Sequence, residues 1–274
     1  MRASWKSAFF CLALAAFPSI STADEGPVLG SLVIVGGGGM PDEVRDKFVA
    51  LAGGEASKIV VIPTASADAD VEAERESFLK PWRKYRPAGL GLLHTRSREK
   101  ADDPAFARPI AEASAVWLGG GDQTRLIAAY RGTSVDRELR ALLARGGVIG
   151  GTSAGAAVMS GVMIEGGNPV AEVGPGFGFV TNAVVDQHFL KRSRLNRLLG
   201  VLADRPGLIG IGIDEGTAFV LENDRWSVLG RSYVVACEPG RDGQPPRFET
   251  FSQGDHGTYP AAGLPTPAAR RPED

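Results

Sequence analysis

The chain has 274 residues, of which 43% are apolar and 23% are charged, and its formal net charge is −2. These values are ordinary for a globular protein and predict one domain with a sizeable buried core. The sequence contains no long basic run, which argues against a nucleic-acid-binding protein, and no long acidic run.

The N-terminal residues have the pattern of a cleaved secretory signal. Arg2 and Lys6 precede an apolar run, AFFCLALAAF, that is too short for a permanent membrane anchor. The small residues of the tripeptide STA are typical of a cleavage site after Ala23. We therefore predict a signal peptide over residues 1–23 and a secreted or periplasmic protein without a membrane span. The alternative is a buried N-terminal helix.

Short apolar segments and helical patterns alternate through the first half of the chain. Strands are predicted at residues 31–36, 58–63, 89–94, 115–120 and 147–152. Helices are predicted at residues 41–53, 70–85 and 135–146. Because the strands are apolar without interruption, the pattern favours a parallel sheet that helices cover on both faces.

The second half of the chain continues with more strands than helices. A strand is predicted at 183–189 and a helix at 190–203, followed by strands at 208–213, 217–223, 226–230 and 232–236. We expect these later strands to be antiparallel and to extend an edge of the sheet. The prediction is an α/β fold, a three-layer α/β/α domain over residues 24–255. The Pro- and Ala-rich residues 256–274 are expected to be a disordered tail.

Residues 151–155, GTSAG, fit the pattern G-x-S-x-G between a predicted strand and a predicted helix. This pattern is typical of a nucleophile on a sharp turn, where bulky residues two positions away would clash with the strand and the helix. A helix N-terminus behind Ser153 would also favour developing negative charge. On the motif alone, the serine is equally compatible with a plain turn.

A nucleophilic serine requires a base and an acid that orients it. Of the three histidines, His188 is favoured because it follows an apolar strand, where a parallel sheet presents its active edge. His94 also follows a predicted strand, but the sequence does not fix the direction in which it points, and His256 lies next to the tail that is expected to be disordered. The acid can be any of four carboxylates, and neighbours on a strand point to opposite faces. The candidates are Glu215, Asp214, Asp186 and Glu165.

An oxyanion requires backbone N–H donors. The glycine turn in WLGGGDQ follows a predicted strand and offers Gly120 or Gly121 as one donor, and Ala154 would supply the other. The glycine run VGGGGM lacks the spacing of a nucleotide-binding loop, and no residues have the spacing of metal ligands. We therefore expect no metal and no organic cofactor. Cys237 lies in an apolar segment and is expected to be buried.

Four segments together resemble the cyanophycinases of serine peptidase family S51, a family that also contains aspartyl dipeptidases. They are GGTSAGAAVMSGVMI, LGGGDQTRL, VVDQHFLKRSRLNRLL and GIGIDEGTA, and the resemblance covers residues 30–237. It implies a fold similar to class I glutamine amidotransferases, with serine in place of cysteine. It also implies that Ser153 is the nucleophile, His188 the base and Glu215 the residue that orients it. The residues that fall on the family's substrate pocket are Gln123, Asp186, Gln187, Arg192, Arg194 and Arg197.

The implied substrate is cyanophycin, a poly-aspartate with arginine on its side-chain carboxylates, and the implied products are β-Asp-Arg dipeptides. Arginines can clamp the free carboxylate of each unit, and Asp186 is expected to face its guanidinium. On one regular helix Arg192, Arg194 and Arg197 would not share a face. Either the first of them precede the helix, or only a subset reaches the pocket.

Two other functions remain open from the sequence. The segment between Glu165 and Asp186 is shorter than expected for a cyanophycinase, which favours an aspartyl dipeptidase acting on short peptides. A binding protein that keeps the pocket without turnover is the second alternative, and the presence of Ser153, His188 and Glu215 argues against it. The resemblance is compatible with a homodimer.

Overall fold

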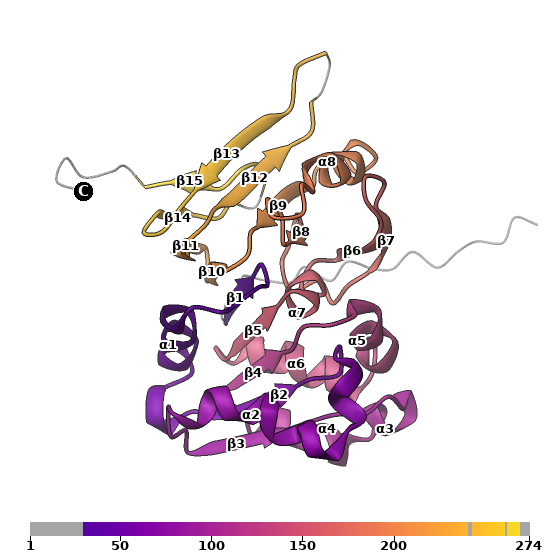
Figure 1. Ribbon diagram of the computed structural model, residues 1–274, viewed down its shortest axis with the longest axis vertical. Coiled ribbons are helices and arrows are strands. Elements are labelled where there is room, and N and C mark those ends of the chain that lie inside the picture. The colour runs from indigo at the N-terminus through magenta and orange to yellow at the C-terminus, as the bar shows by residue number, and fades with distance from the viewer. Residues whose placement is uncertain (1–29, 241–242, 261, 269–274) are drawn as a thin grey trace, which may run out of the picture.

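The computed structural model describes residues 30–240, 243–260 and 262–268. Its largest element is a nine-stranded sheet (Figure 1). Across this sheet the strands are β15 (Thr266–Pro267), β14 (His256–Thr258), β11 (Arg225–Gly230), β10 (Thr217–Glu222), β1 (Ser31–Val35), β5 (Val148–Thr152), β4 (Ala115–Leu118), β2 (Lys58–Ile62) and β3 (Gly89–Leu92).

The sheet changes direction at β1. From β1 through β5, β4 and β2 to β3 all neighbours are parallel, and from β1 through β10 to β15 all neighbours are antiparallel. The predicted parallel sheet with antiparallel strands at one edge is therefore confirmed. Each of the five parallel strands agrees with a strand expected from the sequence.

Helices cover both faces of the parallel strands. The helices are α1 (Asp42–Leu51), α2 (Arg75–Arg83), α3 (Arg98–Asp102), α4 (Pro104–Ala111), α5 (Gln123–Tyr130), α6 (Ser134–Ala144) and α7 (Ala154–Ala157). Alternate residues of β1 divide between two cores: Val33 packs with α1 and α2, whereas Ile34 packs with α3 to α7. This alternation produces the three layers. Short 3-10 turns lie at Gly54–Ala56, Ala67–Asp70 and Glu72–Glu74.

A second sheet, which the sequence did not reveal, has four strands in the order β13 (Arg247–Phe251), β12 (Val234–Glu238), β9 (Ile209–Ile213) and β8 (Ala183–Gln187). In β9 the isoleucines pack into the main core. The glycines face the other way: a Cβ on Gly212 would lie 2.4 Å from the Phe189 ring, and one on Gly210 2.6 Å from Cys237 Sγ. This face therefore makes room for helix α8 (Leu195–Ala203).

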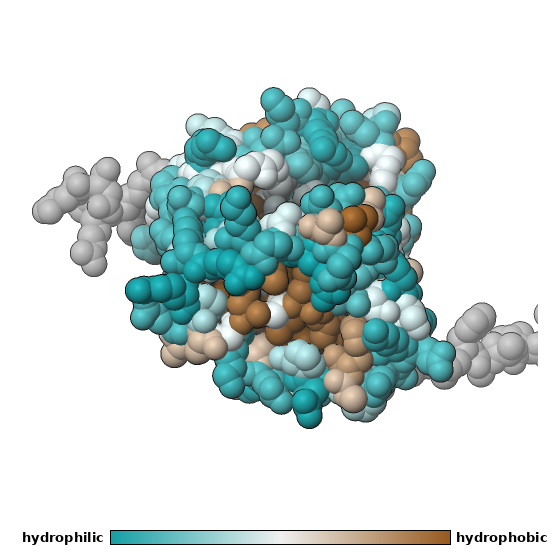
Figure 2. Space-filling view, turned by 60° about the horizontal axis from the view of Figure 1, so that its bottom comes forward, coloured by the Kyte–Doolittle hydropathy of each residue, from teal (hydrophilic) through white to brown (hydrophobic). Residues whose placement is uncertain are grey.

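A two-stranded hairpin, β6 (Val162–Gly166) and β7 (Glu172–Pro175), packs beside the second sheet. Cys237 is buried, as expected, and burial raises the pKa of its thiol to about 12. Most of the surface that Figure 2 shows is hydrophilic, with hydrophobic residues gathered near the centre of that face. Among the described residues no helix has both the length and the hydropathy to cross a membrane.

The expectation of a disordered tail is wrong for part of residues 256–274. His256–Thr258 pair with β11 as β14, and Thr266–Pro267 pair with β14 as β15. The antiparallel edge offers unpaired backbone groups, and this pairing satisfies them despite the Pro- and Ala-rich composition. The proposed signal peptide, residues 1–23, lies outside the described residues.

Candidate active site

Ser153 lies on a sharp turn between β5 and α7, with φ +53° and ψ −109°. A positive φ is a strained conformation for a residue other than glycine. Its neighbours two positions away have no room for side chains. A Cβ on Gly151 would lie 2.4 Å from the carbonyl oxygen of Gly155, and one on Gly155 would lie 2.2 Å from that of Leu118. Both glycines of the motif are therefore required by the geometry of the turn.

His188 follows β8 and faces Ser153, with 2.9 Å between its Nε2 and the serine Oγ. It has φ +49°, and its backbone N–H donates to the carbonyl of Gly36 at 2.6 Å. The ring is nearly buried, since the residue is 8% exposed. The serine and the histidine therefore meet at the carboxyl ends of strands from two different sheets.

Glu215 completes a chain of three side chains. Its Oε1 lies 2.6 Å from His188 Nδ1, on the side of the ring opposite Ser153. Its neighbour Asp214 points elsewhere, because its carboxylate accepts hydrogen bonds from the Lys191 N–H and the Ser232 hydroxyl. We call Ser153, His188 and Glu215 the Ser153 triad.

The pKa of His188 lies below its ordinary value of 6.5. Burial is the main cause, because it disfavours the charged imidazolium, and the cationic side chains of Arg192 and Arg194 act in the same direction. The hydrogen bond with Glu215 acts in the opposite direction without overcoming them. Near pH 7 the ring is therefore neutral and can accept a proton.

A run of glycines after β1 supports the other side of the triad. A Cβ on Gly37 would lie 2.4 Å from the His188 ring, and one on Gly38 would lie 2.8 Å from Glu215 Cβ. In the sequence this glycine run was recognisable only as a turn without the spacing of a nucleotide-binding loop, and its contact with the triad was not predicted. The available signal was the position of the run at the carboxyl end of a parallel strand, where functional residues gather.

The glycine turn after β4 lies against Ser153. A Cβ on Gly120 would lie 3.6 Å from Ser153 Cβ, and Gly121 has φ +137° with no room for a side chain beside Ala65. On the other side of the serine, Ala154 is the first residue of α7, so that its N–H has no acceptor within the helix. Gly120 therefore lies across from the Ser153 side chain, and Ala154 directly follows the serine in the chain.

The three arginines occupy different positions relative to α8, which begins only at Leu195. Arg192 precedes the helix and is exposed, and Arg194 is the residue before its first turn. Arg197 alone lies within the helix and is 3% exposed. The geometric expectation that the first arginines precede the helix is thus confirmed.

Asp186 and Arg197 form a buried ion pair. Arg197 Nε donates to Asp186 Oδ2 at 2.8 Å, its second guanidinium nitrogen donates to Oδ1, and a third donates to the Gly167 carbonyl at 2.8 Å. Asp186 is 1% exposed. This pairing corrects the expectation that Asp186 faces a substrate guanidinium, because Arg197 already occupies both carboxylate oxygens.

Arg194 and the two glutamines also have partners within the protein. Arg194 donates to the Gln187 carbonyl at 2.6 Å and to Gln187 Oε1 at 2.9 Å. Burial, together with the charge of Arg197, lowers the pKa of Arg194 to about 10. Gln123 donates to the backbone carbonyls of Ile164 and Glu165, and so fastens α5 to β6. Only Arg192 projects freely from this group.

The fourth carboxylate candidate, Glu165, lies on β6 and extends over Gly174 of the paired strand. Its backbone carbonyl, rather than its carboxylate, accepts from Gln123. In the part of the chain that the structure describes, no group of three or more His, Cys, Asp or Glu side chains could hold a metal ion.

The sequence and the fold of the chain are similar to those of known peptidases. Residues 32–229 match the model of peptidase family S51. The chain is 34% identical to a cyanophycinase of Trichormus variabilis over 217 residues, which are 74% of this chain and 72% of the relative. It is 33% identical to a cyanophycinase of Geminocystis herdmanii over 205 residues, which are 72% of this chain and 75% of the relative.

Solved structures of peptidases share the fold. The crystal structure of a peptidase from an acI-B1 Actinobacterium superposes with a TM-score of 0.66 at 26% identity, covering 86% of this chain and 99% of the other. A putative peptidase E from Listeria monocytogenes shares the fold with a TM-score of 0.54 at 16% identity, covering 74% of this chain and 99% of the other. The chain therefore belongs to peptidase family S51 and is a serine-type peptidase.

Proposed function

We propose that the protein hydrolyses cyanophycin through an acyl-enzyme on Ser153. The observation that carries the mechanism is the hydrogen-bonded Ser153 triad, with distances of 2.9 Å and 2.6 Å. His188 Nε2 removes the Ser153 proton as Oγ attacks the substrate carbonyl, and returns it to the leaving amine. Glu215 accepts from His188 Nδ1 and holds the ring in that tautomer.

The backbone around Ser153 supports the proposed stabilisation of the oxyanion. Ala154 directly follows the serine and Gly120 lies across from it. In this proposal the N–H of Ala154 and that of Gly121, or of its neighbour Gly120, donate to the developing negative charge. After the amine leaves, a water molecule loses a proton to His188 and attacks the acyl carbonyl. Collapse of that intermediate releases the acid and restores Ser153.

The substrate assignment is supported by the cyanophycinase relatives and by the charges beside the triad. Each β-Asp-Arg unit presents a free carboxylate and a guanidinium. Arg192 is exposed, and its charge acts on His188, so it is the arginine best placed to bind that carboxylate. The neighbouring charged and amide side chains would hold the segment that carries Arg192 in place, because they already form hydrogen bonds with one another. These residues are Asp186, Gln187, Arg194 and Arg197.

We also propose that the protein acts outside the cytoplasm. This proposal is supported by the charged, apolar and small-residue pattern of residues 1–23. An exported enzyme of this kind would use polymer released by other cells. Purification of the chain from the periplasm or medium, beginning at Asp24, is the expected result of expression in a secreting host.

The proposed activity is tested by incubating residues 24–274 with insoluble cyanophycin and measuring β-Asp-Arg by mass spectrometry. The wild type is expected to release the dipeptide and Ser153→Ala to release none. Ser77→Ala is a matched control, because Ser77 is an exposed serine of α2 whose hydroxyl donates to the carbonyl of Glu74, just before that helix. Hydrolysis of short aspartyl peptides without release from the polymer would instead support the aspartyl dipeptidase alternative.

A further inference from the structure

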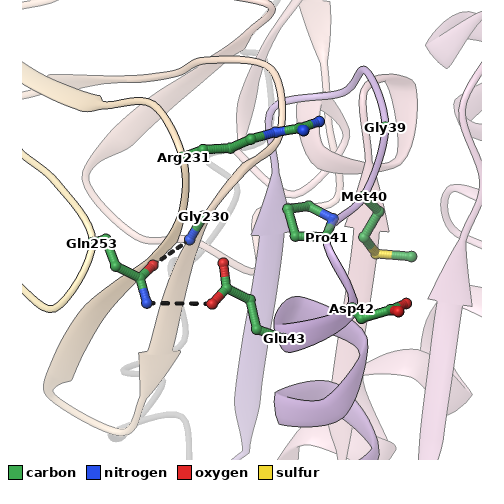
Figure 3. Close-up of a pocket in the computed structure, with 8 residues that line it drawn as sticks. All are labelled: Gly39, Met40, Pro41, Asp42, Glu43, Gly230, Arg231 and Gln253. Atoms are coloured by element: carbon green, nitrogen blue, oxygen red, sulfur yellow. Dashed lines mark hydrogen bonds between the residues drawn. The ribbon is translucent and has the colours of Figure 1, made fainter.

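A cavity of about 470 Å³, which none of the triad residues lines, lies between the loop that joins β1 to α1 and the end of β11 (Figure 3). Its lining includes Gly39 and Glu43 on one side and Gly230, Arg231 and Gln253 on the other. This volume is within the range of small-molecule binding sites, about 300–1,000 Å³. Its residues take no part in the chemistry proposed above.

Two opposite charges line this cavity without an ionic partner. Within the described ranges, Arg231 has no carboxylate and Glu43 no cation at salt-bridge distance. The neighbouring Asp42, by contrast, pairs with both Arg45 and Lys84. In the described residues the cavity therefore offers one guanidinium and one carboxylate whose charges are not paired.

The two charged side chains come from different elements and are held apart. Glu43 belongs to the first turn of α1, and Gln253 Nε2 donates to it at 3.4 Å. Gln253 Oε1 in turn accepts from the backbone N–H of Gly230 (Figure 3). Arg231 follows Gly230 and lies over Gly216, where a Cβ would be 2.9 Å from its Nε. A ligand with both charges can thus be bound between them.

Three consecutive glycines link this cavity to the Ser153 triad. Gly37 packs on His188, Gly38 packs on Glu215, and a Cβ on Gly39 would lie 3.6 Å from the Arg231 guanidinium. Gly39, which lines the cavity, is therefore the residue directly after the glycine that packs on Glu215.

We infer that this cavity is an accessory site that binds a second carboxylate–guanidinium unit of a polymeric substrate. Arg231 holds the carboxylate of that unit and Glu43 holds its guanidinium, each through charge-assisted hydrogen bonds. The inference rests on the proposed function for the identity of the polymer. It explains how a peptidase can retain a chain while successive units are cleaved.

The test measures binding to the Ser153→Ala protein, which keeps the substrate intact. The probes are a single β-Asp-Arg unit and soluble oligomers of a few units. Isothermal titration calorimetry measures the dissociation constant of each. The oligomers are expected to bind about tenfold more tightly than the single unit, which corresponds to ~1.4 kcal/mol. Adding Arg231→Met or Glu43→Gln should abolish most of this difference and leave the affinity for the single unit unchanged.

Arg108→Met is the matched control, since Arg108 is an exposed arginine of α4 that pairs with Glu112. The accessory site would be overturned if the Ser153→Ala protein bound the single unit and the oligomers with equal affinity. It would also be overturned if adding Arg231→Met weakened the binding of the single unit and of the oligomers by the same factor. Turnover by the wild type is measured in parallel. Length-dependent binding without turnover contradicts the proposed function alone, whereas turnover with length-independent binding contradicts the accessory site alone.

Discussion

In the described part of the protein, two sets of hydroxyl, histidine and carboxylate side chains are hydrogen-bonded in series at nearly the same distances. In the Ser153 triad the spacings are 2.9 Å and 2.6 Å. In a second set, which we call the Thr64 network, Thr64 Oγ1 lies 2.8 Å from His94 Nδ1, and His94 Nε2 lies 2.9 Å from Asp70. Hydrogen-bond distances therefore do not by themselves distinguish a nucleophile from a structural hydroxyl.

The surroundings of the two hydroxyls differ. Thr64 is 0% exposed, and its hydroxyl also bonds the buried Tyr130 hydroxyl at 2.7 Å. It follows β2, and neither Thr64 nor its immediate neighbours have a positive φ. Ser153 instead has a positive φ, a helix directly after it and Gly120 across from it. We therefore expect Ser153, and not Thr64, to be the reactive hydroxyl, because it lies on a strained turn directly before a helix N-terminus.

Removal of the two hydroxyls is the strongest test of this comparison. Ser153→Ala should reduce kcat on the polymer by about 10⁴-fold or more, because it removes the nucleophile. Thr64→Val should leave kcat within a few fold and lower the free energy of unfolding by about 1–3 kcal/mol, because partners are left unpaired in the interior. Chemical denaturation and steady-state kinetics measure both. An equal loss of kcat in Ser153→Ala and Thr64→Val would contradict the distinction between a nucleophilic and a structural hydroxyl.

Neutralising the two carboxylates sharpens the comparison. Glu215→Gln should lower kcat by about 10²–10⁴-fold, less than Ser153→Ala, because His188 loses the anion that stabilises its imidazolium. Asp70→Asn should leave kcat unchanged, since His94 does not contact the serine. Wild-type kcat in Glu215→Gln would remove Glu215 from the mechanism.

The glycines of the turn supply a further contrast. Gly155→Ala should reduce both activity and stability, by about 1–3 kcal/mol in the free energy of unfolding, because the added methyl group would lie 2.2 Å from the Leu118 carbonyl. Gly200→Ala in α8 is the control, since open space surrounds that position. A Gly155→Ala protein as active and stable as wild type would show that the turn tolerates a side chain.

The smallest expected effect concerns pH. His188 must be neutral to accept a proton, so the rate falls as pH drops through a pKa that lies below 6.5. Arg192→Met removes a cation that disfavours the imidazolium, and should raise this pKa and move the acid limb to higher pH. The rate of reaction with a neutral serine-directed phosphonate, measured against pH, separates this effect from substrate binding. A limb that moves to lower pH, or does not move, would contradict it.

The sequence predicted the parallel half of the fold well. Four of those five strands are apolar runs that end at glycine, proline or a small polar residue, so that composition and turn residues identify them locally; β3, which continues into Leu93 and His94, has the apolar run alone. The second sheet was not predicted, because nothing in IGIGI indicates that β9 pairs with β8 and β12 rather than with the central sheet. Strand partners depend on long-range packing that a local pattern does not contain.

The same limit applies to the site. The serine turn was recognisable because Gly151 and Gly155 mark it in the sequence, whereas the choice between Asp214 and Glu215 depends on which neighbour faces His188. The pairing of Asp186 with Arg197 was also hidden, since Asp186 and Arg197 meet only when α8 packs on β8. Residue types predicted the chemistry, and the tertiary structure determined which charges are already neutralised.

The most direct test of the central claim is covalent labelling by a fluorophosphonate, with the modified residue identified by peptide mass spectrometry. The account predicts a single label on Ser153 in the wild type, none in Ser153→Ala, and much slower labelling in His188→Asn. Labelling of Thr64, or undiminished labelling of the Ser153→Ala protein, would show that the reactive hydroxyl lies elsewhere.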